Sequence, residues 1–260
     1  MSGKLNDKIT LTVLTDSRGK GLSDVVGNDP QLQDLAYTNV VLSKGAKLKS
    51  LIGKADRLLS DKTSTQGPDY VIIQAGICDF TSLETTNGKR SIRYYRNRDS
   101  INYLAYRIQD IYLKFPGAIN IATVPPAGIR KSIQIAGIEE KQDENLNEQQ
   151  EQLLEDIQEL NQAIIDCNRV TQTETIDLAA KVYSNSKKKR EKRRRITFTD
   201  KGLTDGVHSN DSLTPKWHNL TVEIAKREVR KFSENREYRS HSVDEEDRCF
   251  KRRKDSKTSS

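Results

Sequence analysis

Short runs of apolar and β-branched residues alternate along this chain with longer segments whose apolar residues recur at helical spacing. Most of the short runs are continuously apolar, which is typical of strands that helices cover on both faces. They are residues 9–14, 38–42, 70–74, 119–124 and 175–178. The helical patterns are residues 47–59, 100–115, 147–167 and 215–232. This alternation predicts an α/β fold: a three-layer α/β/α sandwich with a mostly parallel five-stranded sheet.

The length of the chain, 260 residues, suits one such domain with some appendages. We place the domain at residues 5–235. From residue 236 to residue 260 the sequence is rich in Ser, Arg, Lys, Asp and Glu, which predicts a disordered charged tail. An apolar fraction of 34% is low for a wholly globular chain, as expected when polar segments dilute an ordinary core.

The net charge of +7 is local rather than spread over the chain. A basic segment, within a polar insertion near residues 186–197, contains one glutamate and eight basic residues: Lys187, Lys188, Lys189, Arg190, Lys192, Arg193, Arg194 and Arg195. Because its excess charge equals that of the whole chain, a nucleic-acid surface spread over the fold is excluded. Three interpretations stay open: a solvated insertion, a nuclear import signal, or an electrostatic contact to nucleic-acid phosphates. The segment has no interleaved aromatic residues, so base stacking is not indicated.

Cysteine usage points to a reducing compartment. Cys78, Cys167 and Cys249 are widely separated and form no C-x-x-C pair, so they predict neither a disulfide framework nor a metal site. The first eight residues are polar, and no apolar stretch is long enough to span a membrane. We therefore expect an intracellular protein, cytoplasmic or nuclear, with no membrane partner.

A serine and an Asp-x-x-His sequence lie near opposite ends of the predicted domain. Ser17 follows the first strand-like run, and Asp205 and His208 precede the last helical pattern. Ligands of parallel α/β sheets bind beyond the carboxyl ends of the strands, which is where Ser17 is expected. A serine hydroxyl becomes a nucleophile when a base removes its proton, and that base needs a carboxylate to fix its tautomer. These three residues supply the groups, although their spacing alone does not require that they meet.

Four motifs, taken in order, resemble the four blocks of the SGNH (GDSL-type) hydrolases. They are Thr15-Asp16-Ser17, Gly45, Gly76-Ile77-Cys78-Asp79 and Asp205-x-x-His208. The resemblance covers residues 9 to about 230, and it implies the flavodoxin-like architecture of that superfamily. The chain is also similar, more loosely, to the SGNH-type esterase-like domains of invertebrate proteins and of some non-LTR retrotransposon open reading frames.

The resemblance implies a catalytic role for three residues. Ser17 would be the nucleophile, His208 the general base and then acid, and Asp205 the group that orients the imidazole. Together they would hydrolyse a carboxylic ester, with an acyl or acetyl group, through an acyl-enzyme. The substrate would be a small ester or acylated molecule, and the reaction would need no metal and no cofactor.

The same resemblance implies an oxyanion hole. The backbone N–H groups of Ser17 and Gly45 would be donors, and Cys78 stands where the family has an asparagine. A thiol is only a weak donor, and losing one such donor typically costs about 10²–10³ in turnover. Enzymes typically accelerate reactions by about 10⁶ or more, so a slow hydrolase would remain. A second departure is Thr15, which replaces the glycine of the family's first block.

Supporting roles are implied for three further residues: Asp16, Gly76 and Asp79. Several matched residues also have an ordinary structural interpretation. Ser17 would serve as a helix N-cap, Asp205 as a turn residue and His208 as a surface histidine. Gly45 would be a turn residue or a close-packing glycine. Asp79 would cap the segment that follows it. Cys78 is a strand-end thiol, a substitute donor or a nucleophile.

Two functions from different classes therefore stay open. The first is a serine esterase, weakened by the loss of the oxyanion asparagine. The second is a catalytically degenerate SGNH-like scaffold that binds nucleic acid or an acidic partner through its basic segment.

Overall fold

The computed structural model describes residues 8–61, 68–95, 98–138, 145–186 and 195–255. At its centre is a four-stranded parallel sheet in the order β2-β1-β3-β6. The strands are β1 (Ile9–Thr15), β2 (Ala36–Leu42), β3 (Tyr70–Gln74) and β6 (Ile119–Ile121). Four of the five strand-like runs thus form this sheet, and the prediction of an α/β fold is confirmed.

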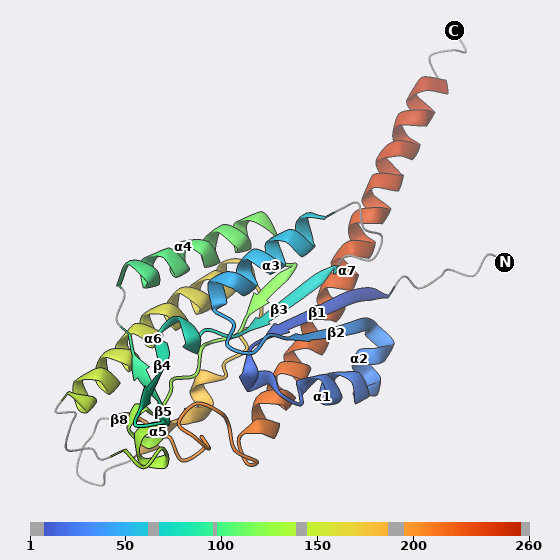
Figure 1. The fold of residues 1–260 in the computed structure, drawn as a ribbon. Helices are drawn as coiled ribbons and strands as arrows, with labels where there is room; N and C mark the ends of the chain where they lie inside the picture. The colour runs from blue at the N-terminus through green and yellow to red at the C-terminus, as the bar shows by residue number, and fades with distance from the viewer. Residues whose placement is uncertain (1–7, 62–67, 96–97, 139–144, 187–194, 256–260) are drawn as a thin grey trace.

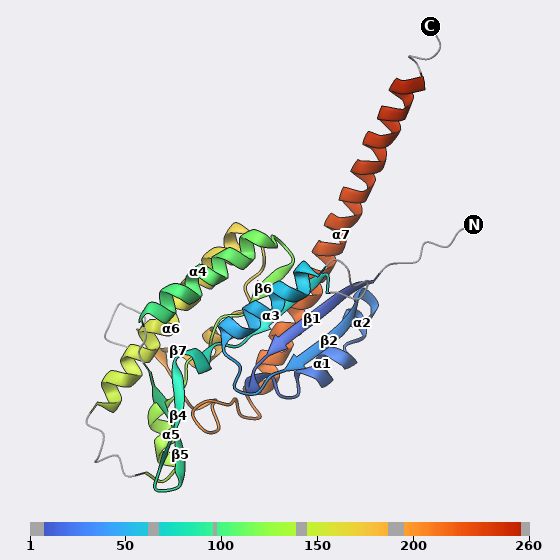
Figure 2. The ribbon, with the colours of Figure 1, turned by 45° about the horizontal axis from the view of Figure 1, so that its top comes forward.

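Helices cover both faces of the sheet (Figure 1; Figure 2). One layer contains α3 (Leu48–Ser60), α4 (Arg98–Lys114) and α6 (Leu146–Val170). The other contains α1 (Leu22–Asn28), α2 (Pro30–Leu35) and the start of α7 (Thr214–Asp255). The four longer helices correspond to the four helical patterns of the sequence. Neither α1 nor α2 was predicted, because each is too short to show a helical repeat.

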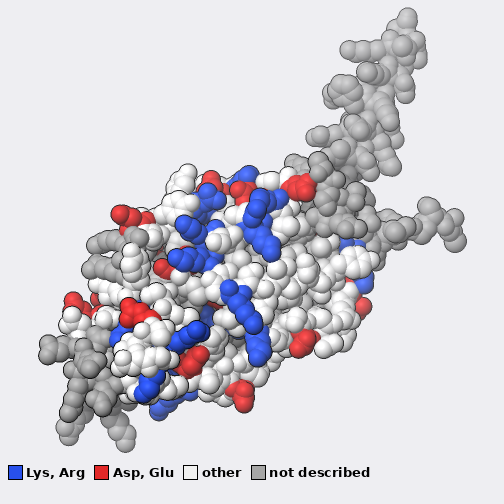
Figure 3. Space-filling model, viewed as in Figure 1, with Lys and Arg blue, Asp and Glu red and all other residues white. Residues whose placement is uncertain are grey.

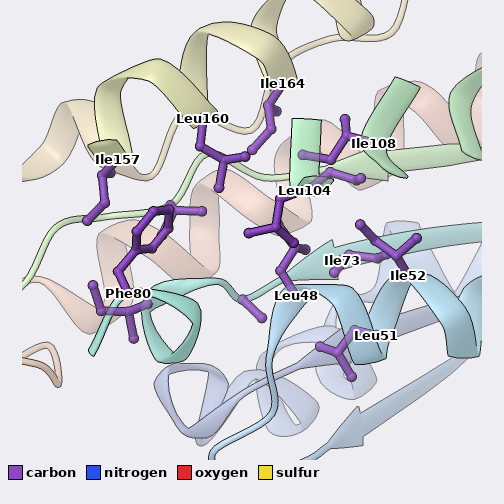
Figure 4. Packing of buried hydrophobic residues seen from close by; sticks show 14 of the residues in the cluster. Leu48, Leu51, Ile52, Ile73, Phe80, Leu104, Ile108, Ile157, Leu160 and Ile164 are labelled. Carbon is purple, nitrogen blue, oxygen red and sulfur yellow. The ribbon is translucent and has the colours of Figure 1, made fainter. Parts of the chain in front are cut away.

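Alternate side chains of the sheet enter two separate cores. Val71 and Ile73 of β3 belong to the core under α3, α4 and α6, whereas Tyr70 and Ile72 belong to the core under α1 and α7. All four side chains are fully buried. Figure 4 shows residues of the first core, among them Ile73, Leu48, Ile52, Leu104 and Ile108. Burial on both faces explains why β3 is continuously apolar.

The predicted fifth strand, residues 175–178, is not a strand. Ile176 is buried beside the end of β6, and its carbonyl accepts a hydrogen bond from the Thr123 N–H (3.0 Å). The Leu178 N–H also donates to the Ile176 carbonyl (3.1 Å), and the Ala179 N–H donates to the Thr123 hydroxyl (3.0 Å). Because these local bonds replace a strand ladder, the central sheet has four strands in the part of the chain that the structure describes.

Two hairpins and a short helix were also not predicted. β4 (Thr81–Thr86) pairs with β5 (Lys89–Tyr94), and β7 (Tyr183–Ser186) pairs with β8 (Arg195–Phe198). The short helix α5 (Ile129–Ile135) follows β6. β4 is almost wholly exposed, so its sequence has no buried apolar face that would indicate a strand.

The last helix is longer than predicted. It continues to Asp255, whereas the sequence predicted an end near Phe232 and a disordered tail from residue 236. After Pro215 the chain holds neither glycine nor proline and is rich in Glu, Lys and Arg, which favour helix even without an apolar face. The domain limit at residue 235 stays a prediction. No helix among the described residues has the length and apolar character needed to cross a membrane.

Truncating either face of β3 should destabilise the fold. Ile72→Ala and Ile73→Ala each remove a side chain that is 0% exposed, so each is expected to lower the free energy of unfolding by about 2–5 kcal/mol. Urea denaturation measures this loss. Val170→Ala is the matched control, because Val170 is 77% exposed and its truncation should change stability by less than about 0.5 kcal/mol. An Ile72 variant as stable as the control would contradict the burial of that face.

Candidate active site

Three strands end at the same edge of the sheet. Thr15, the last residue of β1, pairs in register with Leu42 of β2 and with Gln74 of β3. The bonds continue past the strands, since the Asp16 N–H donates to the Gln74 carbonyl (3.3 Å) and the Ser43 N–H donates to the Thr15 carbonyl (2.8 Å). The loops that carry the first three sequence motifs therefore start side by side.

Ser17 begins a short 3₁₀ turn, η1 (Ser17–Gly19), directly after β1. The N-cap of this turn is Asp16, whose Oδ1 accepts a hydrogen bond from the Arg18 N–H (2.9 Å). The interpretation of Ser17 as an N-cap is therefore wrong. Instead, the Ser17 Oγ lies 3.0 Å from the Nε2 of His208, a residue 191 positions further along the chain.

Asp205 and His208 lie in the loop between β8 and α7. Asp205 Oδ1 accepts hydrogen bonds from the backbone N–H groups of Val207 (2.9 Å) and His208 (2.8 Å). Its Oδ2 lies 2.7 Å from His208 Nδ1. The Asp205 carboxylate thus stabilises the backbone of the loop and also orients the His208 imidazole.

The loop depends on Gly206. Its φ is +86°, in the left-handed region, and a Cβ there would lie 2.3 Å from the Gly128 carbonyl oxygen. The Gly128 N–H donates to the Gly206 carbonyl (2.7 Å), so the loop is fastened to the segment that begins α5. Only glycine fits both the backbone conformation and this approach.

The hydrogen bonds define the tautomer of His208. The Asp205 carboxylate only accepts, so Nδ1 donates to it, and Nε2 of the neutral ring accepts from the Ser17 hydroxyl. The bond to Asp205 raises the pKa of His208 above its usual value, against the effect of burial. Burial opposes the ionisation of Asp205, but hydrogen bonds from His208 and Val207 outweigh it and hold the pKa well below its usual range. The site therefore pairs a charged carboxylate with a strengthened base.

Gly45 and Asp79 meet the start of α3 from two sides. Gly45 lies in the turn before this helix, and Asp79 lies in η2 (Ile77–Asp79), the turn after β3. The Asp79 Oδ2 accepts a hydrogen bond from the Leu48 N–H (2.6 Å). Asp79 therefore caps α3, which precedes it in the chain, rather than the segment that follows it. Burial raises the pKa of Asp79 to about 6, although the Leu48 bond and the charge of Lys47 oppose the rise.

Gly76 and Cys78 lie at the same turn. Gly76 has a φ of +140°, and a Cβ there would lie 2.5 Å from Val124 Cγ2, so glycine allows the end of β3 to approach the segment after β6. Cys78 is partly exposed, and burial raises the pKa of its thiol. Because a cysteine nucleophile needs thiolate character, the raised pKa argues against that interpretation of Cys78.

Three polar residues that position this edge were not singled out from the sequence: Arg18, Gln74 and Asn161. Asn161 of α6 holds the backbone of Val124, accepting from its N–H (2.6 Å) and donating to its carbonyl (2.9 Å). Arg18 is 5% exposed, and its Nη1 donates to the Pro125 carbonyl (2.7 Å). Arginine is rarely buried, so nothing in the sequence around Arg18 indicates this role.

An open hollow of about 490 Å³ lies beside the turn that carries Asp79. It is lined from the starts of α3 and α4 and from η2, by Lys47, Lys49, Asp79, Asp99, Ser100, Tyr103 and Leu104. The lining is mixed in charge, so it offers both donors and acceptors to a bound molecule. Among the described residues, no cluster of three or more His, Cys, Asp or Glu side chains is arranged to hold a metal ion.

The basic segment joins β7 to β8. Its residues from Lys187 to Arg194 lie outside the described residues, and of Arg195, the first residue of β8, only the backbone is described. On the face shown in Figure 3, Lys and Arg side chains occur in several groups, with Asp and Glu side chains among them.

Comparison with known proteins found distant similarity to a solved structure. No family model and no curated protein sequence matches the chain. A solved structure described as "a putative platelet activating factor from Streptococcus pneumonia" is 15% identical, with a TM-score of 0.42. The match covers 88% of this chain and 86% of that chain. Similarity at this level establishes neither a shared activity nor a shared substrate.

Removing the charge of Asp79 should stabilise the protein at high pH. Its pKa in the folded state, about 6, is above the usual value for an unfolded chain, so its ionisation costs stability as the pH rises through that value. Asp79→Asn keeps an acceptor for the Leu48 N–H. It is expected to raise the free energy of unfolding by about 1–3 kcal/mol at pH 8, a gain that shrinks toward pH 4.

Urea denaturation at the two pH values tests this expectation. Asp56→Asn is the control of opposite sign, because a hydrogen bond from Lys114 lowers the pKa of Asp56. That variant should show no gain at pH 8. If Asp79→Asn, like Asp56→Asn, gives no gain in the free energy of unfolding at pH 8, burial does not raise the pKa of Asp79.

Proposed function

We propose that this protein is a serine ester hydrolase of the SGNH type, which cleaves a small carboxylic ester through an acyl-enzyme. The observation that carries the proposal is the chain of hydrogen bonds from Ser17 Oγ through His208 to Asp205, with distances of 3.0 and 2.7 Å. Such a chain can activate a serine, because it joins a nucleophile, a base and the group that orients the base. The four ordered sequence motifs are consistent with the same chemistry.

The mechanism follows from the tautomer of His208. Its Nε2 takes the proton of the Ser17 hydroxyl as the oxygen attacks the ester carbonyl, and Asp205 stabilises the imidazolium that forms. The imidazolium then gives the proton to the leaving alcohol, which leaves the acyl group on Ser17. A water molecule, deprotonated by the same nitrogen, releases the acid and restores the hydroxyl.

The oxyanion hole is the weaker part of the proposed machinery. The backbone N–H groups of Ser17 and Gly45 supply two donors, on loops that begin at the same edge of the sheet. Cys78 supplies a thiol, which is a weak donor. We therefore propose slow turnover, lower by about 10²–10³ than an asparagine at that position would allow.

Hydrolysis of p-nitrophenyl acetate tests the role of Ser17. Ser17→Ala should lower kcat/KM by roughly 10³-fold or more, because it removes the nucleophile. The matched control is Ser23→Ala, at an exposed serine of α1, which should retain the wild-type rate. If Ser17→Ala and Ser23→Ala hydrolyse the ester equally fast, the hydrolase proposal is wrong.

The pH dependence of the wild-type rate is part of the same test. The base must be neutral, and its pKa is raised by Asp205, so the rate should rise with pH through a midpoint above about 6.5 and then level off.

Cys78→Asn tests the proposed oxyanion hole. An amide N–H is a stronger donor than a thiol, so this variant should increase kcat for p-nitrophenyl acetate by at least about tenfold. The control is Cys167→Ala, which should leave kcat unchanged. Cys167 packs in the core beside α6, so alanine is used there rather than asparagine, whose amide would be buried. An unchanged kcat in the Cys78 variant would contradict the placement of Cys78 beside the oxyanion.

The partners and the location of the protein stay predictions. The basic segment is proposed to contact nucleic-acid phosphates or an import receptor, consistent with a cytoplasmic or nuclear protein. Its charge motivates the proposal, and such binding would weaken as salt is added.

A further inference from the structure

A cluster of buried polar side chains lies beneath the turn that carries Ser17. It consists of Asp16, Arg18 and Gln74, which are 1%, 5% and 3% exposed. Two of the three flank Ser17 in the chain, and the third ends β3. Burying a charged pair and an amide together is unfavourable unless their polar atoms are satisfied.

Part of the cluster is paired within the protein. Arg18 Nη1 donates to the Pro125 carbonyl (2.7 Å), and Arg18 Nε lies 3.8 Å from Asp16 Oδ2. Asp16 Oδ1 accepts from the Arg18 N–H (2.9 Å). Arg18 therefore ties the turn after β1 to the segment after β6, across the end of β3.

The three residues also line one small cavity. Three buried atoms of the cluster have no hydrogen-bond partner among the described protein groups: Asp16 Oδ2, Arg18 Nη2 and Gln74 Nε2. All three residues line a single cavity of about 10 Å³, which is completed by Ala75, Thr123, Pro125, Leu178 and Trp217. That volume is about the size needed for one water molecule, and buried waters typically make about three hydrogen bonds.

We propose that this cavity binds one water molecule, which accepts from Arg18 Nη2 and Gln74 Nε2 and donates to Asp16 Oδ2, and that Asp16, Arg18 and Gln74 are thereby positioning residues for Ser17. The water-binding half stands on its own, whereas the positioning half rests on the proposed hydrolase function. Two donors and one acceptor around a space of this size match the bonding capacity of water.

The arrangement explains how the Ser17 hydroxyl keeps its place. Ser17 lies between Asp16 and Arg18 in the chain, and the side chains of both are buried and paired beneath the turn. The proposed water would connect both side chains to Gln74 by hydrogen bonds. The link joins the ends of β1, β3 and β6, so the nucleophile is positioned by three strand ends rather than by one turn. Small misplacements of a reacting group are costly in rate, which is why such a link matters to turnover.

The cluster also bears on the base. The charged groups that act on His208 are Asp205, Arg18 and Asp16. Arg18 lowers the pKa of His208 and Asp16 raises it, so their effects oppose each other. Replacing both Arg18 and Asp16 with neutral residues should leave the pKa of His208 nearly unchanged. Replacing only one of them should shift that pKa.

A crystal structure of the wild-type protein at high resolution tests the water directly. We expect density for one water within about 3.2 Å of Arg18 Nη2, Gln74 Nε2 and Asp16 Oδ2. An empty cavity, or an Arg18 guanidinium turned so that both of its terminal nitrogens bond Asp16, would overturn the water site.

Three variants test the positioning role. Gln74→Met removes one donor without leaving a charge, and it should lower kcat for p-nitrophenyl acetate about tenfold or more while KM changes little. Arg18→Met should raise the pKa of His208, measured by nuclear magnetic resonance of its ring, because it removes a nearby positive charge. The double variant Arg18→Met/Asp16→Asn removes both charges and should return that pKa close to the wild-type value.

The matched control is the exposed pair Arg227 and Glu174, whose bonds are 2.7 Å. Arg227→Met/Glu174→Gln should leave both kcat and the pKa of His208 unchanged. A Gln74 variant with wild-type kcat, or an Arg18 variant with an unshifted His208, would overturn the positioning role. The crystal structure needs no turnover, so it still decides the water site if Ser17 proves not to hydrolyse esters.

Discussion

The parallel pairing of β1 with both of its neighbours is the constraint on which the site depends. Because Thr15 is in register with Leu42 and Gln74, the turns that carry Ser17, Gly45 and Cys78 all start at one edge of the sheet. Two apolar cores hold the sheet from either side, so this edge cannot shift without disturbing buried side chains. The loop that carries His208 comes to the same edge because Asp205 and Gly206 fold it and Gly128 holds it.

Much of this could be predicted from the sequence, for identifiable reasons. Apolar runs indicated β1 and β3, since these strands are buried on both faces, and β2 was indicated although it is an edge strand and only partly buried. The ordered motifs identified the three residues that meet at the edge. The strand expected at residues 175–178 does not form, because Thr123 satisfies the neighbouring backbone with its side chain. Equally, the buried state of Arg18 depends on the Pro125 carbonyl, more than one hundred residues away, which no local pattern reveals.

Hydrogen bonds join Ser17, His208 and Asp205, whereas the proposed oxyanion hole has a thiol as its third donor. His208 is oriented by a carboxylate that stays ionised, which favours proton transfer from Ser17. Burial raises the pKa of the Cys78 thiol, so Cys78 keeps its proton and would be only a weak donor in the proposed oxyanion hole. Proton transfer and charge stabilisation contribute separately to a rate, so we propose slow hydrolysis rather than a scaffold without chemistry.

The most direct measurement is covalent labelling with a fluorophosphonate, followed by mass spectrometry of the peptides. Such a reagent reacts with a serine whose proton a neighbouring base removes, and it requires no knowledge of the natural substrate. The account predicts one label, on Ser17, in the folded protein, and its loss when His208 is replaced by glutamine. Folded protein that leaves Ser17 unlabelled, or labels it equally well without His208, would contradict the claim that this imidazole activates this hydroxyl.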